Sequence, residues 1–177
     1  AEAVADTQET QQPTEIVKSD KPKVELFVMT YCPYGTQAEK GLIPVLKLLN
    51  DKIDGTIRFV HYFMHGDKEE TETYNQVCIR EEQTNKYIDY LACFLEDGDS
   101  NRCITKIGID KAKLISCLST KAKDYYAKDS ELSKQYGIQG SPTLVINEVE
   151  ASSGRSSSAF LTTICSAFNT PAEECNQ

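Results

Sequence analysis

A short apolar run that leads straight into a cysteine and then a helix most constrains the fold of this chain. Residues 24–29 (VELFVM) have the pattern of a buried strand, and Tyr-Cys-Pro-Tyr-Gly follows at 31–35. Beyond it, apolar residues recur at spacings of three and four, which predicts a helix: Ala38, Leu42, Val45, Leu46 and Leu49. Residues 56–63 predict a second strand, so the unit is typical of a parallel pair with a right-handed crossover.

A long helical segment then separates this unit from the rest of the fold. Residues 67–136 carry two apolar stripes at helical spacing, and a segment of about 70 residues is too long for a loop. We therefore expect a helical subdomain inserted into an α/β domain made of residues 23–66 and 137–177. In the second part, residues 143–146 predict a third strand, and 159–168 a last helix after a turn region at 151–158.

Charge and polarity narrow the possible functions. The net charge is -8, with 27 acidic and 19 basic residues, which excludes a phosphate-tracking nucleic-acid binder. No apolar run reaches the roughly 18 residues of a membrane-spanning helix, so no transmembrane segment is expected. Residues 1–22 are polar and rich in Gln, Thr and Glu, which predicts a disordered leader.

Seven cysteines favour an oxidising compartment, and hence an extracytoplasmic protein that is periplasmic, on the cell surface or secreted. The odd count then predicts three structural disulfides and one free thiol. Two pairs bracket turns and could close short loops, and the third pair is left within the helical segment: Cys93–Cys103, Cys165–Cys175 and Cys78–Cys117. Two alternatives stay open, namely a cytosolic chain with seven reduced thiols and a role for Cys78 as a distant resolving cysteine for Cys32.

Cys32 is the candidate nucleophile because it would lie where a strand ends and a helix begins. Backbone N–H groups are unpaired there and the helix dipole favours negative charge, so the thiolate form is stabilised. Pro33 suits the first helical position because it has no N–H to leave unpaired. Tyr31, Pro33 and Tyr34 surround Cys32 and are candidate substrate contacts.

No metal and no other cofactor are expected. His61 and His65 are four residues apart, but they straddle a strand end instead of sharing one face of a helix. No pair of cysteines has zinc-finger spacing.

Taken in order, these segments resemble the DsbA-like group of extracytoplasmic bacterial thiol–disulfide oxidoreductases. The resemblance rests on residues 24–35, on Gly-Ser-Pro-Thr at 140–143, and on the helical segment that separates them. It covers roughly residues 23–168.

The resemblance implies a thioredoxin fold with helices inserted before a loop that carries a cis-proline. Pro142 would be that proline, in cis and beside Cys32. Ser141, Pro142 and Thr143 would line a groove that binds an extended peptide. The partners implied are cysteine-containing exported proteins or peptides, and a membrane redox partner is compatible with this class.

Two positions depart from the family pattern. The family motif is Cys-x-x-Cys, but Gly35 stands in the second cysteine position, so Cys32 lacks the local thiol that would release a substrate. Many relatives also carry an acid six residues before the first cysteine, where this chain has Leu26. Glu25 is one residue away, which in a strand points the side chain to the other face, so it is not expected to relay protons.

The predicted function is thiol–disulfide exchange through the single thiol of Cys32, by reduction or isomerisation of disulfides in exported proteins. A redox-inactive peptide-binding module with the same fold is one alternative. A dithiol enzyme in which Cys78 resolves the mixed disulfide is another. A third is that Gly35 is an engineered or lineage-specific loss in an otherwise dithiol enzyme.

Overall fold

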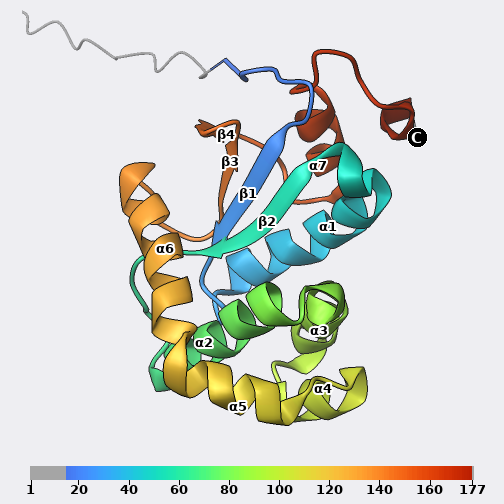
Figure 1. Cartoon of the computed structure of the whole chain (residues 1–177). Coiled ribbons are helices and arrows are strands. Elements are labelled where there is room, and N and C mark those ends of the chain that lie inside the picture. Colours follow the sequence, from blue (N-terminus) through green and yellow to red (C-terminus); the bar gives the residue numbers. More distant parts are fainter. Residues whose placement is uncertain (1–14, 177) are drawn as a thin grey trace, which may run out of the picture.

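Four strands form one mixed sheet in the order β2-β1-β3-β4 (Figure 1). The computed structural model describes residues 15–176 of the chain. β1 (Lys23–Val28) lies inside the sheet, parallel to β2 (Asp54–Phe59) and antiparallel to β3 (Thr143–Ile146). β4 (Val149–Ala151) forms a hairpin with β3 and makes the other edge.

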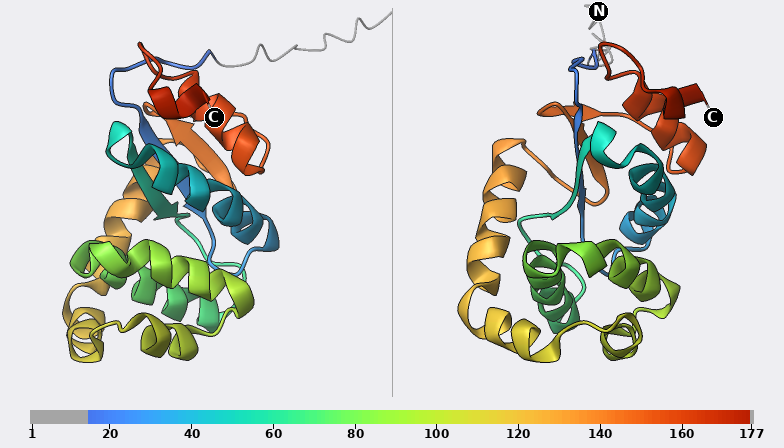
Figure 2. Two further views of the ribbon diagram at one scale, coloured as in Figure 1. Left: turned by 90° about the vertical axis from the view of Figure 1, so that its right-hand side faces the viewer. Right: turned by 45° about the vertical axis from the view of Figure 1, so that its right-hand side comes forward.

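Helices cover both faces of the sheet. α1 (Pro33–Leu49) and α7 (Ser157–Cys165) pack together on one face, and α6 (Ala122–Gln135) lies on the other (Figure 2). The alternation of a strand sends Leu26 and Val28 of β1 into the core under α1, whereas Phe27 packs on the opposite side. β1 is rich in apolar residues because it is buried on both faces, and Glu25 is its one fully buried charged residue.

The helical subdomain follows β2 and lies below the sheet in Figure 1. It comprises α2 (Asp67–Glu82), α3 (Thr84–Asp97), α4 (Ser100–Ile107) and α5 (Lys111–Thr120), and α6 leads back to the sheet. Helices α3 and α4 end at glycines with left-handed backbone, Gly98 and Gly108, where an L side chain would be strained.

Three disulfides join neighbouring helices, and they are the pairs expected from the sequence. Their S–S distances are 2.05, 2.15 and 2.06 Å for Cys78–Cys117, Cys93–Cys103 and Cys165–Cys175. The first joins α2 to α5 and the second joins α3 to α4. Cys32 is the one free cysteine in the described part of the chain.

A network of ion pairs centred on the buried Asp129 joins α6 to the sheet and to α2. The fully buried Asp129 carboxylate accepts hydrogen bonds from Arg58 (2.9 Å) and from Arg80 (2.7 and 3.0 Å), and also from the Phe59 backbone N–H (3.1 Å). Arg58 also binds Glu25 at 3.0 Å. Each buried charge in this network therefore has a partner of opposite charge.

Three segments differ from the sequence predictions. The second strand, expected over residues 56–63, is β2 and ends at Phe59. Part of the disordered leader expected over residues 1–22 is ordered, because Ser19 bridges Phe168 and so joins the C-terminal part of the chain. The part of that prediction that covers residues 1–14 lies outside the described region. β4 falls in a stretch where no strand was expected. Asn147 and Glu148 have positive φ, which suits the two-residue turn of a tight hairpin and folds β4 back onto β3.

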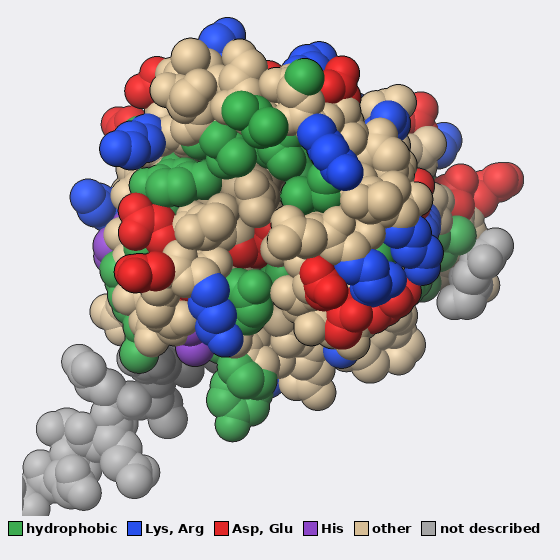
Figure 3. All heavy atoms as spheres, turned by 90° about the horizontal axis from the view of Figure 1, so that it is seen from below, with side chains coloured by type: hydrophobic (Ala, Val, Ile, Leu, Met, Phe, Trp, Pro, Cys, Tyr) green, Lys and Arg blue, Asp and Glu red, His purple; other side chains and the backbone are tan. Residues whose placement is uncertain are grey.

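The surface of the helical subdomain carries some exposed apolar side chains (Figure 3). Ile115 and Leu118 of α5 are among them and border a groove beside α2 and α4. Over residues 15–176, no helix has both the length and the apolar character required to cross a bilayer.

Candidate functional site

Cys32 is the N-cap residue of α1 and directly precedes its first residue, Pro33. The Cys32 backbone is extended (φ -74°, ψ 120°), and its carbonyl accepts the hydrogen bond from the Thr36 N–H (2.9 Å). Pro33 occupies the first turn, and that turn contains no acidic residue. Cys32 is 8% exposed and stands at the positive end of the 17-residue helix α1.

The loop before β3 brings a cis-proline to this cysteine. The Ser141–Pro142 bond is cis, as the resemblance implies. The Cys32 thiol donates to the Ser141 carbonyl with an Sγ–O distance of 3.6 Å, and the Ser141 hydroxyl accepts from the Met29 N–H at 2.9 Å. Ser141 therefore ties the end of β1 to the proline loop and sets the position of Pro142 relative to the thiol.

Thr143, the third residue expected in the groove, begins β3. Its backbone pairs with Phe27, and its hydroxyl donates to the Gly140 carbonyl at 2.8 Å. This bond closes the proline loop from within. The structure thus gives Thr143 a role in shaping the loop.

Gly35 is buried and faces Ser141. A Cβ placed on Gly35 would overlap the Ser141 hydroxyl oxygen and would lie 3.5 Å from the Cys32 Cβ. The serine hydroxyl therefore occupies the space in which a second cysteine side chain would begin. This relation between positions 35 and 141 has no signature in the sequence.

The two tyrosines beside Cys32 have different environments. Tyr31 points into the helical subdomain: its ring packs edge-on against Phe94 at 5.5 Å, and its hydroxyl donates to the Gly98 carbonyl at 3.3 Å. Burial and the nearby Glu72 carboxylate raise the pKa of Tyr31 above its ordinary value. Tyr34, in contrast, is 63% exposed, and Pro33 is exposed as well.

Glu69 supports the segment that precedes Cys32, and sequence reasoning missed it. Its buried carboxylate accepts from the backbone N–H groups of Tyr31 (3.3 Å) and Met64 (2.9 Å) and contacts the His65 ring nitrogen at 2.6 Å. In the sequence it belongs to a run of acids that is typical of the solvated first turn of a helix. The spacing of four between His65 and Glu69 was the only available signal.

Two further buried acids lie between α1 and the helical subdomain. Glu39 on α1 is almost completely buried, and its Oε2 atom has no hydrogen-bond partner among the described residues. Burial, reinforced by the negative charge of Glu72, raises the pKa of Glu39 to about 8. Burial also raises the pKa of Glu72 to about 7, against the opposing effect of hydrogen bonds from Tyr90 (2.7 Å) and Ser100 (3.1 Å).

The two histidines are held by separate partners. His61 contacts the Ser133 hydroxyl at 2.7 Å, whereas His65 contacts Glu69. Within residues 15–176, no group of three or more His, Cys, Asp or Glu side chains is arranged to hold a metal ion.

Comparison with known proteins shows the fold. The chain is similar to BdbD from Bacillus subtilis (15% identity, TM-score 0.67) and to DsbA from Mycobacterium tuberculosis (16%, 0.68), each over 92% of both chains. It is also similar to MdbA of Actinomyces oris, a thiol-disulfide oxidoreductase (11%, 0.64, over 85% of this chain and 83% of that one). No family model and no curated protein matches the sequence.

These likenesses define the class of fold. The chain has the thioredoxin fold of the DsbA-like proteins, with the helical subdomain inserted after β2, which confirms the predicted fold class. Cys32 stands at the start of α1, next to the loop that holds the cis-proline.

Proposed function

We propose that this protein carries out thiol–disulfide exchange on cysteine-containing exported proteins or peptides, with Cys32 as its only nucleophile. One observation carries the proposal. The free thiol of Cys32 lies at the N-terminus of α1, and its Sγ is 3.6 Å from the carbonyl that precedes the cis-proline Pro142. The likeness to oxidoreductases of the same fold supports it.

The exchange needs two steps. First, the Cys32 thiolate attacks one sulfur of a substrate disulfide: a Cys32–substrate S–S bond forms, the substrate S–S bond breaks, and the second substrate sulfur leaves as a thiolate. Then another thiolate attacks the mixed disulfide, forms a new disulfide with the substrate sulfur and releases the Cys32 thiolate.

The source of the second thiolate decides the outcome. If it belongs to the same substrate, the disulfide is rearranged with no net oxidation or reduction. If a small thiol or a partner protein supplies it, a second thiolate of that reductant must then attack the reductant–substrate disulfide. This step forms a disulfide between the two reductant sulfurs and releases the substrate sulfur as a thiol, so the substrate is reduced by two electrons. Gly35 offers no thiol for either route, so we propose isomerisation or thiol-dependent reduction.

We place this activity outside the cytoplasm, in the periplasm, on the cell surface or in the secreted fraction. Three disulfides support this, because such bonds persist in oxidising compartments. A membrane redox partner that regenerates the thiol fits the same proposal.

The test is trapping of the mixed disulfide. Protein kept free of reductant is first alkylated after denaturation, and intact mass should show one label, at Cys32. Untreated protein is then mixed with a peptide that contains one disulfide, and mass spectrometry should find one peptide bound through Cys32. Cys32→Ser should form no adduct, whereas Cys78→Ala/Cys117→Ala should still form it. A wild-type protein that forms no adduct would overturn the proposal.

A redox-inactive peptide-binding module is the second candidate, and one observation favours it. The Cys32 side chain is only 8% exposed, and its thiol already donates to the Ser141 carbonyl. If peptides bind reversibly, with equal affinity in wild type and Cys32→Ser and without a covalent adduct, this second function is correct.

A further inference from the structure

We propose that the cavity beside Pro142 selects substrates that carry an acidic side chain near their reactive cysteine, and that Arg155 binds this acidic side chain. The inference rests on the proposed function, because it names the class of substrate that Cys32 would receive. Nothing in the sequence motifs singles out Arg155, which lies in a stretch of serines and glycine before α7.

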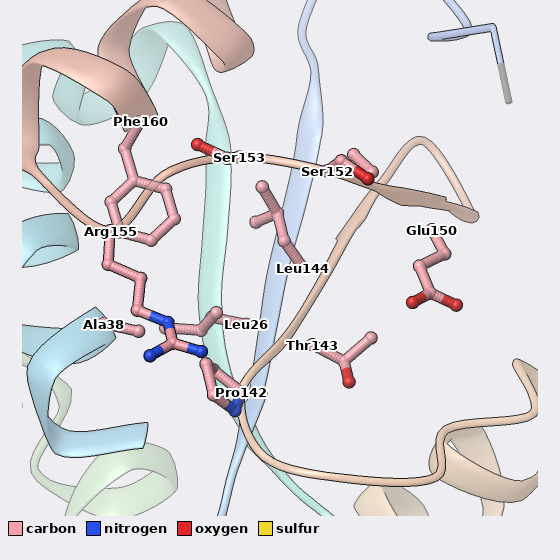
Figure 4. Close-up of a pocket in the computed structure, with 11 residues that line it drawn as sticks. Leu26, Ala38, Pro142, Thr143, Leu144, Glu150, Ser152, Ser153, Arg155 and Phe160 are labelled. Carbon is pink, nitrogen blue, oxygen red and sulfur yellow. The ribbon is translucent and has the colours of Figure 1, made fainter. Parts of the chain in front are cut away.

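The cavity has a volume of about 210 Å³ and lies between the proline loop, α1 and the segment that joins β4 to α7. Its floor is apolar, with Leu26, Ala38 and Phe160 among the lining residues. The Arg155 side chain reaches across the cavity, and its guanidinium group points toward Pro142 (Figure 4). A cation thus stands directly beside the loop that positions Cys32.

Contacts with α1 hold Arg155 in place. Its guanidinium carbon lies 5.0 Å from the centre of the exposed Tyr34 ring, which is a cation–π distance, and one of its nitrogens donates to the Gln37 side chain at 3.2 Å. The Arg155 carbonyl packs so closely on Gly41 that a Cβ at position 41 would overlap it. The Ser157 hydroxyl also donates to the Gly41 carbonyl at 2.8 Å. The loop is therefore fixed on α1, and the arginine is preorganised.

The charge of Arg155 has no carboxylate partner within residues 15–176, although the chain has 27 acidic residues. The carboxylate side chain that lines the same cavity, Glu150, lies at the opposite end from Arg155 (Figure 4). A guanidinium group has a planar fork of donors that matches a carboxylate. The unpaired arginine therefore complements an acidic side chain better than a neutral one.

The position of Arg155 sets where the acid must be. A substrate joined to Cys32 would run in extended form past Ser141 and Pro142, and such a chain advances about 3.3 Å per residue. The Arg155 guanidinium group lies on the ring of Tyr34, two residues after Cys32, and points toward Pro142. The acidic side chain should therefore lie within about three residues of the substrate cysteine. The cavity would then hold the aliphatic part of a glutamate.

The experiment measures the rate at which Cys32 attacks short peptides. Each peptide is acetylated and amidated, so that it has no terminal charge, and its single cysteine carries an uncharged thiopyridyl group that absorbs when released. The peptides place Glu, Gln or Lys two residues before or after the cysteine. At low salt, one Glu peptide should react about three to five times faster than the matching Lys peptide, the size expected for an exposed ion pair. Added salt should reduce this ratio.

Substitutions of Arg155 test whether this residue causes the rate difference between the Glu and Lys peptides. Arg155→Gln should bring the Glu/Lys rate ratio to about one, Arg155→Glu should invert it, and Arg155→Lys should keep part of it. Lys113→Glu makes the same charge change on an exposed position of α5 and should leave the ratio as in wild type. If Lys113→Glu lowers the Glu/Lys rate ratio as much as Arg155→Glu does, the ratio reflects the net charge of the protein. That result would overturn the assignment to Arg155.

The experiment distinguishes a wrong acidic subsite from a wrong exchange activity. If wild type reacts equally fast with the Glu, Gln and Lys peptides, the acidic subsite is wrong and the proposed exchange activity stands. If no peptide forms a mixed disulfide with Cys32, the proposed activity is wrong and the inference falls with it.

Discussion

The Ser141 hydroxyl fills the space that a side chain on Gly35 would need. Its oxygen would overlap a Cβ at position 35, and it accepts a hydrogen bond from the Met29 N–H at 2.9 Å. Ser141 can make this bond at this position because residue 35 is a glycine. The proline loop, through Ser141, therefore fits a glycine at position 35, where the family motif has its second cysteine.

A pair of alanine substitutions should reveal this coupling. Gly35→Ala alone should lower the free energy of unfolding by about 1–3 kcal/mol, because the added methyl group forces the serine away from Met29. In Gly35→Ala/Ser141→Ala the loss should be smaller than the sum of the two single losses, since the overlapping atom is gone. Urea unfolding of the four proteins measures this; strictly additive losses would contradict it.

The same pair governs how a second thiol can be introduced. Gly35→Cys/Ser141→Ala should shorten the lifetime of the mixed disulfide at Cys32, because an intramolecular thiol becomes available without a clash. Gly35→Cys alone should shorten it less. The lifetime is followed by mass spectrometry after quenching with acid, and Gly35→Ala/Ser141→Ala is the control without a thiol. Equal lifetimes in the control and the cysteine variant would show that position 35 does not reach the mixed disulfide.

Buried Glu39 should make stability depend on pH. Its pKa is about 8 in the folded protein, well above the value of about 4.3 for an exposed glutamate, so the folded state binds its proton more firmly than the unfolded state. Stability should therefore be highest in mild acid and should decline as the pH rises toward 8. Glu39→Gln should reduce this decline, as measured by urea unfolding between pH 5 and pH 8.

A surface glutamate provides the matched control for that measurement. Glu131 is exposed on α6, and Glu131→Gln should leave the pH dependence of wild type unchanged. Some decline should persist in Glu39→Gln, because burial also raises the pKa of Glu72, to about 7. A Glu39→Gln variant with the full wild-type decline would contradict the assignment.

Asp129 should be among the most sensitive positions for stability. Asp129→Ala leaves the buried guanidinium group of Arg80 and the partly buried one of Arg58 without their shared carboxylate and should cost about 3–5 kcal/mol. Asp124→Ala, on an exposed face of the same helix, should change stability by less than about 0.5 kcal/mol. Denaturant unfolding checks both, and a loss below 1 kcal/mol at Asp129 would mean that the ion network contributes little.

The Cys78–Cys117 disulfide should be structural. It closes a loop across a sequence separation of 39 and joins α2 to α5, so its removal in Cys78→Ala/Cys117→Ala should cost about 2–4 kcal/mol. The lifetime of a mixed disulfide at Cys32 should not change. A longer lifetime in Cys78→Ser than in wild type would instead identify Cys78 as the resolving cysteine.

Local patterns in the sequence were enough to predict most of the architecture. The apolar run of β1, the start of α1 at Cys32 and the helical segment from Asp67 onward all depend on spacing between near neighbours, which reports burial directly. Two of the disulfide pairs could be proposed because each closes a short loop around a turn. β4 was missed because three residues are too few to show a period.

The details of the site were decided by contacts between distant parts of the chain. Ser141 meets Met29 across a separation of 112 residues, and Arg155 meets Gln37 across 118. Glu39, Glu69 and Glu72 have the composition of solvated helix faces, yet the packing of the helical subdomain buries all three. Sequence by itself determined where strand, cysteine and helix follow one another, because those features are local. Tertiary structure decided what surrounds the thiol, because burial and charge pairing depend on which surfaces meet.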